Sequence, residues 1–346
     1  MEKILRFELT DNCNLRCSMC WSRSWTHKEM KYDQIKRIIL DFKSNSGQTV
    51  VLTSREPLLS KSFRSIIELC DAEELDLKIL TNGTLITGEL AEYIVKSKSV
   101  SYLAISLHGN EKVHDSITGV PGSFQMAITG LKRINKYKIE NRKKYPEVRI
   151  TSVISAELFD AIEEIIALAS ETHSQLRIQH YMWHPEWIKK LHKESLLDIY
   201  NIKDDIIEGF SSNCDIDADT VVSQLKQISY QCKKRGIDLQ VYPKLVTHEI
   251  ERWYSHDSVL VFNEASCNHV SDSLRLRANG DVSLCQYIDI PIGNATNQDL
   301  KSIISNSRYA EIAEALKKGK LFPICNRCCH VKSKCGSPHS ISNAEI

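Results

Sequence analysis

The chain has 346 residues, of which 42% are hydrophobic and 26% are charged, and its formal net charge is +1. This length can bury one large core and a smaller appended unit, and the balanced charge excludes a general attraction to nucleic acid or to an acidic membrane. No apolar run is long enough to span a bilayer, and the N-terminal segment MEKILRFELT lacks the apolar core of a signal peptide, so we expect a cytoplasmic protein.

Short apolar runs alternate with helical patterns through the first two thirds of the chain. The spacing predicts strands at Ile4–Leu9, Val50–Thr53, Leu77–Leu80, Tyr102–Leu107, Val148–Ile154 and Leu176–Tyr181, separated by helices over Asp33–Phe42, Phe63–Cys70, Leu90–Val95, Phe124–Tyr137 and Leu158–Ala169. Such βα repeats indicate an α/β fold whose parallel sheet rolls into a partial (β/α)6 barrel. In barrels of this kind the active site lies at the C-terminal ends of the strands.

The remaining third of the chain changes character twice. A helix-rich insertion at about residues 185–235 precedes a predicted strand at Leu239–Tyr242, and the composition shifts again near Ser255. We therefore expect a barrel over residues 1–250 and a small hairpin-plus-helix extension over residues 251–346. The hairpin strands, Leu274–Leu276 and Val282–Leu284, flank Asn279-Gly280, which is a two-residue turn signal in which glycine supplies the positive torsion.

Twelve cysteines are many for a chain of a reducing compartment, where clustered cysteines more often bind metal than form disulfides. Cys13, Cys17 and Cys20 follow the first predicted strand with the spacing CxxxCxxC. Three thiolates can hold three corners of an iron–sulfur cubane and leave one iron open. A zinc site or free thiols are the alternative, with His27 as the nearest possible fourth ligand. Three further cysteines lack motif spacing, and we expect them to be structural: Cys70, Cys214 and Cys232.

This cysteine motif resembles the CxxxCxΦC signature of the radical S-adenosylmethionine (SAM) superfamily, with Met19 at the position Φ that is usually aromatic. The resemblance implies that SAM chelates the open iron of a [4Fe–4S] cluster. Electron transfer from a donor such as flavodoxin or ferredoxin would then cleave SAM to methionine and a 5′-deoxyadenosyl radical that abstracts a substrate hydrogen. The protein would position this chemistry and exclude water.

Motifs after three further strands extend the resemblance. In LTSREPLL, Ser54 and Arg55 replace the glycines of a Gly-Gly-Glu-Pro motif, and Glu56 remains as the residue that would contact the SAM amino group. Asn82 in ILTNGTLI and Ser106 in YLAISLHG match family positions close to SAM. Read without the family, these segments are an ordinary strand-end loop and a turn signal.

Two other segments bear on the interior of the predicted barrel. VHDSITGVPGSF resembles a loop that often carries an arginine for the SAM carboxylate, but Thr118 stands at that place. In the sixth predicted strand Arg177, Gln179 and Tyr181 alternate and would share one face. If that face points inward, these three residues are the candidates for catalysis and substrate contact, and a buried Arg177 would need an anionic partner such as the substrate.

The C-terminal cysteines resemble the SPASM and twitch extensions of radical SAM enzymes. The resemblance implies one auxiliary [4Fe–4S] cluster, held by Cys267, Cys285, Cys325 and Cys328. A full SPASM extension usually has seven cysteines for two clusters, and Cys329 and Cys335 could substitute for one of these ligands or belong to a second, incomplete site. A structural zinc ribbon is the alternative, with His330 and His339 as possible extra ligands.

Taken together, the resemblance implies a radical SAM oxidoreductase or maturase that acts on a peptide or a small molecule, with the auxiliary cluster accepting or relaying an electron. No nucleic acid or membrane partner is expected, nor an N-terminal peptide-recognition domain, because the first strand starts at Ile4. Two alternatives stay open. One is a dehydrogenase or epimerase of a small natural-product alcohol or sugar. The other is a non-catalytic metal-binding barrel whose Ser54-Arg55 pair marks a degenerate SAM site.

Overall fold

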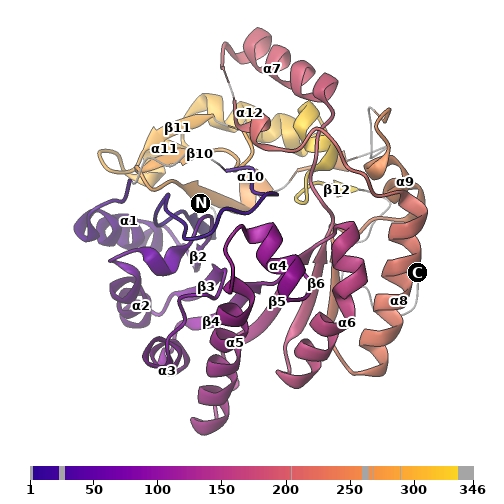
Figure 1. Ribbon diagram of the computed structural model, residues 1–346. Helices are drawn as coiled ribbons and strands as arrows, with labels where there is room; N and C mark the ends of the chain where they lie inside the picture. Colours follow the sequence, from indigo (N-terminus) through magenta and orange to yellow (C-terminus); the bar gives the residue numbers. More distant parts are fainter. Residues whose placement is uncertain are drawn as a thin grey trace.

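A curved parallel sheet with helices on its outer face dominates the computed structural model, which describes residues 3–22, 28–203, 205–258, 265–267, 269–288 and 290–333 (Figure 1). The predicted strands are confirmed, and neighbouring strands in the chain are neighbours in the sheet. They are β1 (Ile4–Phe7), β2 (Thr49–Leu52), β3 (Asp76–Thr81), β4 (Val100–Ser106), β5 (Glu147–Val153), β6 (Gln175–Gln179) and β7 (Leu239–Tyr242).

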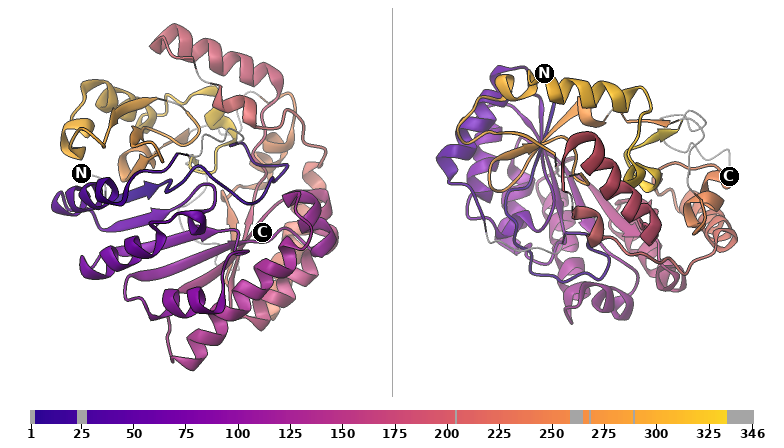
Figure 2. Two further views of the ribbon diagram at one scale, coloured as in Figure 1. Left: turned by 60° about the vertical axis from the view of Figure 1, so that its left-hand side comes forward. Right: turned by 90° about the horizontal axis from the view of Figure 1, so that it is seen from above.

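Helices follow these strands and cover the outside of the sheet (Figure 2). α1 illustrates the pattern, since Ile35, Ile38, Ile39 and Phe42 form its buried stripe. Burying one such side chain contributes about 1.5–3 kcal/mol. The helices are α1 (Tyr32–Ser44), α2 (Phe63–Ala72), α3 (Gly88–Lys96), α4 (Glu111–Thr118), α5 (Ser123–Glu140), α6 (Ala156–Glu171), α7 (Glu186–Tyr200), α8 (Ala218–Lys234) and α9 (Thr247–Tyr254). None of the helices in the described ranges is both long and apolar enough to cross a lipid bilayer.

The sequence pattern does not predict the helix α4. The segment read as a loop after the fourth strand contains α4, which begins after Asn110 and ends at Thr118. The Asn110 side chain caps the helix by accepting from the Val113 N–H, and Gly119 ends it in the left-handed conformation at φ 66°. The capping asparagine and the terminal glycine are both visible in the sequence. They enclose only eight residues, which is too short a segment to show a clear helical period.

The C-terminal extension continues the barrel sheet. β9 (Ser273–Leu276) pairs in parallel with β1, so that Leu274 lies opposite Leu5 and Leu276 opposite Phe7. β10 (Asp281–Ser283) and β11 (Pro291–Asn294) extend the sheet in antiparallel fashion. The expected boundary at residue 250 falls inside α9.

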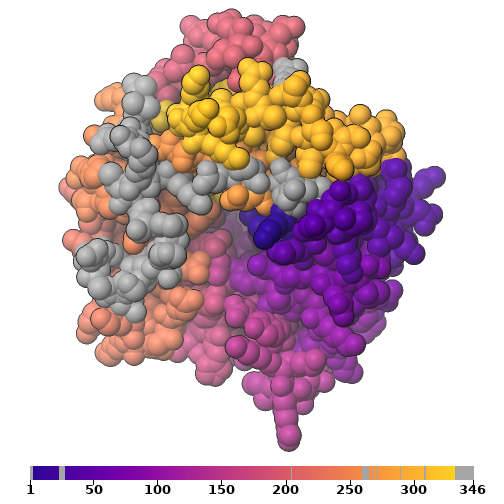
Figure 3. All heavy atoms as spheres, turned by 180° about the vertical axis from the view of Figure 1, so that it is seen from behind, coloured from indigo at the N-terminus to yellow at the C-terminus, as the bar shows by residue number. Residues whose placement is uncertain are grey.

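Short elements complete the extension: β8 (Ala265–Ser266), α10 (His269–Asp272), α11 (Leu300–Ile304), α12 (Ser307–Lys317) and β12 (Lys332–Ser333). Short 3-10 turns lie at Pro57–Leu59, Ile206–Gly209 and Pro323–Arg327. Seen from behind, the gold C-terminal residues lie across one end of the barrel, above the indigo first strand (Figure 3).

The hairpin between β9 and β10 turns at Gly280, as expected, although the turn type differs from the prediction. The Gly280 N–H donates to the Arg277 carbonyl, and the Arg277 N–H donates to the Asp281 carbonyl, so the loop has three residues, 278–280, instead of two. Gly280 has φ +88°, which is the left-handed position that follows a type I turn in loops of this length.

Replacing Gly280 by alanine should destabilise the protein by about 2–4 kcal/mol, because a left-handed alanine costs about 1 kcal/mol and overpacking typically adds 1–3 kcal/mol. An added Cβ would lie 2.3 Å from Thr296 Cγ2. Gly122→Ala is the matched control, since Gly122 has φ +81° but nothing within 4 Å of its added Cβ. Urea unfolding of both variants measures the difference. Equal losses of stability would contradict the packing explanation.

Candidate functional site

The loop that carries the N-terminal cysteine triplet lies at the C-terminal end of β1 and is held by backbone hydrogen bonds. The Arg16 N–H donates to the Thr118 carbonyl and the Ser18 N–H to the Ile117 carbonyl, each at 2.8 Å. Both acceptors are carbonyls in the last turn of α4, which have no partner within their own helix. The helix missed in the sequence therefore anchors the cysteine loop.

Cys13, Cys17 and Cys20 are brought together at this loop. Burial, together with the nearby thiols of Cys20 and Cys13, raises the pKa of Cys17 to about 12. All three are half-buried and line the same cavity. Three adjacent thiols are a donor set that fits an iron–sulfur cluster with one open iron. Within the described ranges, no three His, Cys, Asp or Glu side chains are placed to hold a single metal ion. His27 lies outside the described residues.

The loop after β2 keeps a glycine-like backbone although its glycines are replaced. Ser54 and Arg55 have φ values of 62° and 50°, in the left-handed region that glycine adopts at little cost. Side-chain contacts hold both residues there. Arg275 on β9 donates to Ser54 Oγ at 2.6 Å, and Arg55 donates to the Ser22 carbonyl at 2.6 Å. The substitution of the two glycines therefore does not remove the backbone conformation that they would provide.

Glu56 is fully buried, and its carboxylate accepts three hydrogen bonds. Oε1 accepts from Leu58 N–H at 3.0 Å and from Thr81 Oγ1 at 2.7 Å, and Oε2 accepts from Asn82 N–H at 2.7 Å. Glu56 is not among the residues that line the cavity. Its observed contact is thus with the end of β3, where it positions Asn82.

Asn82 itself faces the cysteine loop. Its side-chain amide donates to Asn14 Oδ1 at 2.9 Å and lies 4.0 Å from the Cys13 sulfur. Asn82 lines the cavity, so the loops that follow β1, β2 and β3 converge on one place.

Replacing Glu56 by glutamine should flatten the pH dependence of stability. Burial raises the pKa of Glu56 from 4.5 to about 7. The folded chain therefore holds the proton more tightly than the unfolded chain, and this stabilisation, complete below about pH 4.5, is lost as pH rises through 7. Between pH 5.5 and 8, the free energy of unfolding should fall by about 2 kcal/mol more in the wild type than in the variant.

Urea unfolding at both pH values measures this difference. Glu163→Gln, on the exposed face of α6, is the control, and its free energy of unfolding should change with pH as that of the wild type does. If the free energy of unfolding of Glu56→Gln changes with pH as in the wild type, the proposed ionisation of Glu56 is contradicted.

The cavity enclosed by the strands has a volume of about 1250 Å³, and the cysteine loop lines part of it. Besides Asn82 and the cysteines, three further candidate residues from the sequence line it: Ser106, Arg177 and Gln179. Tyr181 does not, because β6 ends at Gln179 and the chain then leaves the strand. The Tyr181 carbonyl instead accepts from Trp253 Nε1 at 2.8 Å.

Two buried histidines lie near the predicted SAM motifs without adding positive charge. Burial lowers the pKa of His108 to about 3 and that of His114 to about 4, so both rings are neutral at physiological pH. His114 Nδ1 accepts from the His108 N–H at 3.1 Å. They line the cavity beside Thr118, which donates or accepts a hydrogen bond with Ser123 at 2.7 Å.

Cysteines of the C-terminal extension form a second group. Four of them lie close enough for their thiols to shift one another's pKa: Cys267, Cys285, Cys325 and Cys328. Burial raises the pKa of Cys325 well above its usual range, and the thiols of Cys285 and Cys267 add to the effect. For Cys328 the largest cause of a raised pKa is its hydrogen bond with Cys329. Cys335 and His339 lie outside the described residues.

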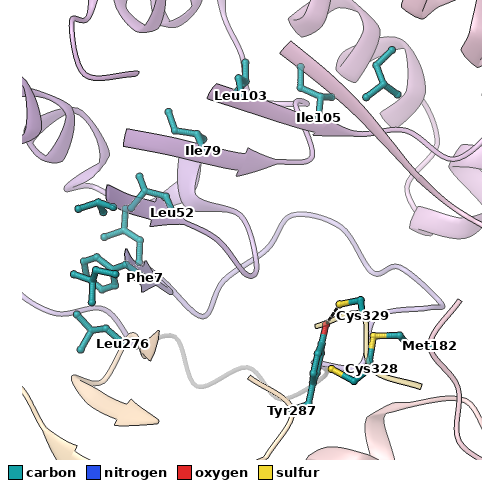
Figure 4. Close-up of a cluster of buried hydrophobic side chains, with 14 of the residues drawn as sticks. Phe7, Leu52, Ile79, Leu103, Ile105, Met182, Leu276, Tyr287, Cys328 and Cys329 are labelled. Carbon is teal, nitrogen blue, oxygen red and sulfur yellow. Dashed lines mark hydrogen bonds between the residues drawn. The ribbon is translucent and has the colours of Figure 1, made fainter. Parts of the chain in front are cut away.

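Aromatic side chains fill the space around this second group. Figure 4 shows Tyr287, Cys328, Cys329 and Met182 gathered at one place, with the Tyr287 hydroxyl 3.5 Å from the Cys329 sulfur. The ring of Tyr287 also packs edge-on against Trp21, next to Cys20, with centroids 5.5 Å apart. These two rings place aromatic surface between the two cysteine groups.

A polar network connects the extension to the loop after β2. Besides Ser54, Arg275 binds Glu8 on the adjacent β1 segment in a buried ion pair and donates to Gln286 Oε1 at 2.8 Å. Gln286 in turn lies 3.1 Å from His330 Nε2. Sequence reasoning missed Arg275, because its partners are up to 267 positions away in the chain.

Two family models match the chain. Residues 7–169 match the radical SAM superfamily, and residues 267–329 match an iron–sulfur cluster-binding domain of the SPASM type. The first match implies a [4Fe–4S] cluster that binds SAM, and the second implies auxiliary iron–sulfur binding. The matched ranges contain the two cysteine groups.

Individual relatives agree with these matches. The mycofactocin maturase MftC of Mycolicibacterium smegmatis is 31% identical over 177 residues, which is 50% of this chain and 43% of that relative's length. An AdoMet-dependent heme synthase of Methanosarcina barkeri is 23% identical over 349 residues, covering 96% of this chain and 87% of the relative.

Among solved structures, Streptococcus suis SuiB bound to the precursor peptide SuiA has a TM-score of 0.68 and 17% identity, with 94% of this chain and 71% of SuiB covered. At this identity the likeness concerns the fold. It extends over the barrel and the cysteine-rich extension together.

Proposed function

Since the chain belongs to the radical SAM superfamily and carries a SPASM-type extension, we propose that it is an oxidoreductase or maturase that modifies a peptide by radical chemistry. The observation that carries this proposal is the half-buried triplet Cys13, Cys17 and Cys20 in the lining of a large cavity. Its three thiols lie close together at the C-terminal end of β1. When bound there, a [4Fe–4S] cluster and SAM supply a carbon radical that removes a hydrogen atom from a substrate.

The residues around the triplet would orient SAM and exclude water. Asn82 and Ser106 line the cavity at the ends of adjacent strands, and we propose them as SAM-binding residues. Glu56 would act through the hydrogen bond that it accepts from Asn82. Arg177 and Gln179 lie on the wall of the same cavity, where they can contact a substrate.

The second cysteine group would hold an auxiliary cluster that accepts or relays an electron. We propose Cys267, Cys285, Cys325 and Cys328 as its ligands. The Cys285 and Cys328 sulfurs also accept from the backbone N–H groups of Tyr287 and His330, each at 3.4 Å. Hydrogen bonds of this kind tune the potential of iron–sulfur clusters.

A peptide substrate is supported by the similarity of half of the chain to a mycofactocin maturase. The heme synthase covers far more of the chain at lower identity, and this favours a small-molecule substrate as the second candidate. A non-catalytic barrel is disfavoured, because Ser54 and Arg55 keep the left-handed backbone that the motif requires. An electron donor such as flavodoxin or ferredoxin is part of the proposal.

Incubation of the reconstituted, reduced protein with SAM and candidate peptides tests the substrate class. A peptide substrate should lose hydrogen atoms or change mass only when SAM and reductant are both present, and should increase the yield of 5′-deoxyadenosine. If no peptide is altered but a small alcohol or a porphyrin carboxylate is, the peptide proposal is overturned and the second candidate stands.

A further inference from the structure

The interior wall of the barrel carries several cationic side chains and almost no acidic ones. Among the described cavity-lining residues, the only carboxylate is that of Glu147, against a larger set of cations: Arg6, Arg16, Arg55, Lys78, Arg149 and Arg177. Three of these arginines lie on strands of the barrel. Arg6 is on β1, Arg149 on β5 and Arg177 on β6, and we call them the arginine layer.

The arginine layer lies deeper than the cysteine triplet. Its members precede the strand ends by one to four residues, whereas the triplet follows the end of β1. Tyr242 on β7 connects two of them electrostatically. The Arg177 guanidinium lies over its ring at 4.9 Å, and Arg6 is also an electrostatic neighbour of Tyr242. Arg149 and Arg177 lie close enough for their charges to repel.

These guanidinium groups are incompletely paired within the described part of the chain. Arg6 forms no hydrogen bond or ion pair there, and its Nε is buried without a partner. Within the described ranges Arg177 donates to Gln240 Oε1 at 3.0 Å, and its Nε is likewise buried without a partner there. Arg149 is 8% exposed and donates twice to the neutral Gln175, and the carboxylates of Asp238 and Glu147 offset part of its charge.

Buried arginines are normally compensated by an anion, because removing a charge from water is costly. A guanidinium presents a planar fork of donors that matches the oxygens of a carboxylate or a phosphate. Since His108 and His114 are neutral, the positive charge of this cavity comes from groups that stay ionised over the physiological pH range.

We propose that the arginine layer is a substrate subsite that binds an oxyanion, a carboxylate or a phosphate, of the molecule to be modified. This inference rests on the proposed function. It adds that the substrate enters the barrel with its anionic group first, and that the reacting carbon lies between this group and the cysteine triplet.

Isothermal titration of the cluster-loaded protein with glutarate and, separately, with inorganic phosphate tests the subsite at low ionic strength. Saturating S-adenosylhomocysteine is present throughout, so that binding at the SAM position does not contribute. We expect one of the two anions to bind, with its affinity reduced at least tenfold in Arg6→Gln and in Arg177→Gln. Arg177→Lys keeps the charge but loses the planar fork of donors, so its affinity for the anion should lie between those of the wild type and Arg177→Gln.

Arg235→Gln is the matched control, because Arg235 is exposed directly after α8 and pairs with Glu163. It should bind the anion as the wild type does. Binding of glutarate alone identifies a carboxylate substrate, and binding of phosphate alone a phosphorylated one.

The subsite is overturned if neither anion binds the wild type, or if Arg6→Gln and Arg177→Gln bind it normally. Thermal unfolding and the visible cluster spectrum identify a variant that fails to fold. If one glutamine variant does not fold, the other glutamine variant and Arg177→Lys decide the question. These binding measurements stand even if the wild type does not cleave SAM, so the two proposals can fail separately.

Discussion

Replacing Cys17 by alanine should abolish SAM cleavage while the C-terminal cluster stays in place. Cys17 lies in the middle of the triplet, and the residues on either side of it donate to the two carbonyls at the end of α4, which fixes its position in the loop. The yield of 5′-deoxyadenosine should fall more than about a hundredfold, which exceeds the usual effect of losing a group that only supports a metal ligand. Iron should fall from about eight to about four per chain, the content of one remaining [4Fe–4S] cluster.

Cys232→Ala is the control for this variant. Cys232 is fully buried on α8 and belongs to neither cysteine group, so its loss should reduce stability slightly and leave the iron content unchanged. Iron that stays near the wild-type value in Cys17→Ala would contradict the assignment of the triplet.

The double variant Cys325→Ala, Cys328→Ala should lose the auxiliary cluster and with it the formation of product. Both residues lie at the 3-10 turn Pro323–Arg327 or directly after it, deep in the extension. Removal of two of the four proposed ligands would leave too few thiolates for a cubane, even if Cys329 replaced one of them. We expect iron to fall by about half and product to fall more than about a hundredfold, whereas 5′-deoxyadenosine should still form.

Metal analysis of the same variant separates a cluster from a zinc ribbon. Loss of about four iron atoms per chain supports the cluster. Loss of zinc with no change in iron would identify a ribbon instead. Cys70→Ala, at a buried position of α2, is the control that should change neither metal.

The barrel was predictable because its signals are local. Each strand alternates or runs apolar over four to seven residues, and helices such as α1 show one buried stripe. The cysteine spacing was equally local, and it located both groups. α4 was missed because its cap residue and its terminal glycine enclose a segment too short for a clear periodic pattern.

The parts that could not be predicted depend on contacts between distant segments. The pairing of β9 with β1 joins residues about 270 positions apart, and no strand pattern specifies such a partner. The role of Arg275 in holding Ser54 depends on this pairing. Similarly, the alternation of side chains placed Arg177 and Gln179 on one face of β6. It could not show that β6 ends before Tyr181, because this end depends on how the following residues pack against Trp253.

Arg6 and Arg149 were not singled out from the sequence, although both follow the strand alternation that identified Arg177. Applying the same test to every strand would have found them. What the sequence lacks is the information that these residues from β1, β5 and β6 face one cavity with a single lining carboxylate among the described residues.

The most direct measurement is the formation of 5′-deoxyadenosine by the wild-type protein. The chain is reconstituted anaerobically with iron and sulfide to about eight iron atoms per chain, then reduced in the presence of SAM. Cleavage of SAM, seen as 5′-deoxyadenosine and methionine in equal amounts, is the outcome that follows from the triplet in the lining of the cavity. A fully loaded protein that binds SAM but releases no 5′-deoxyadenosine would contradict it.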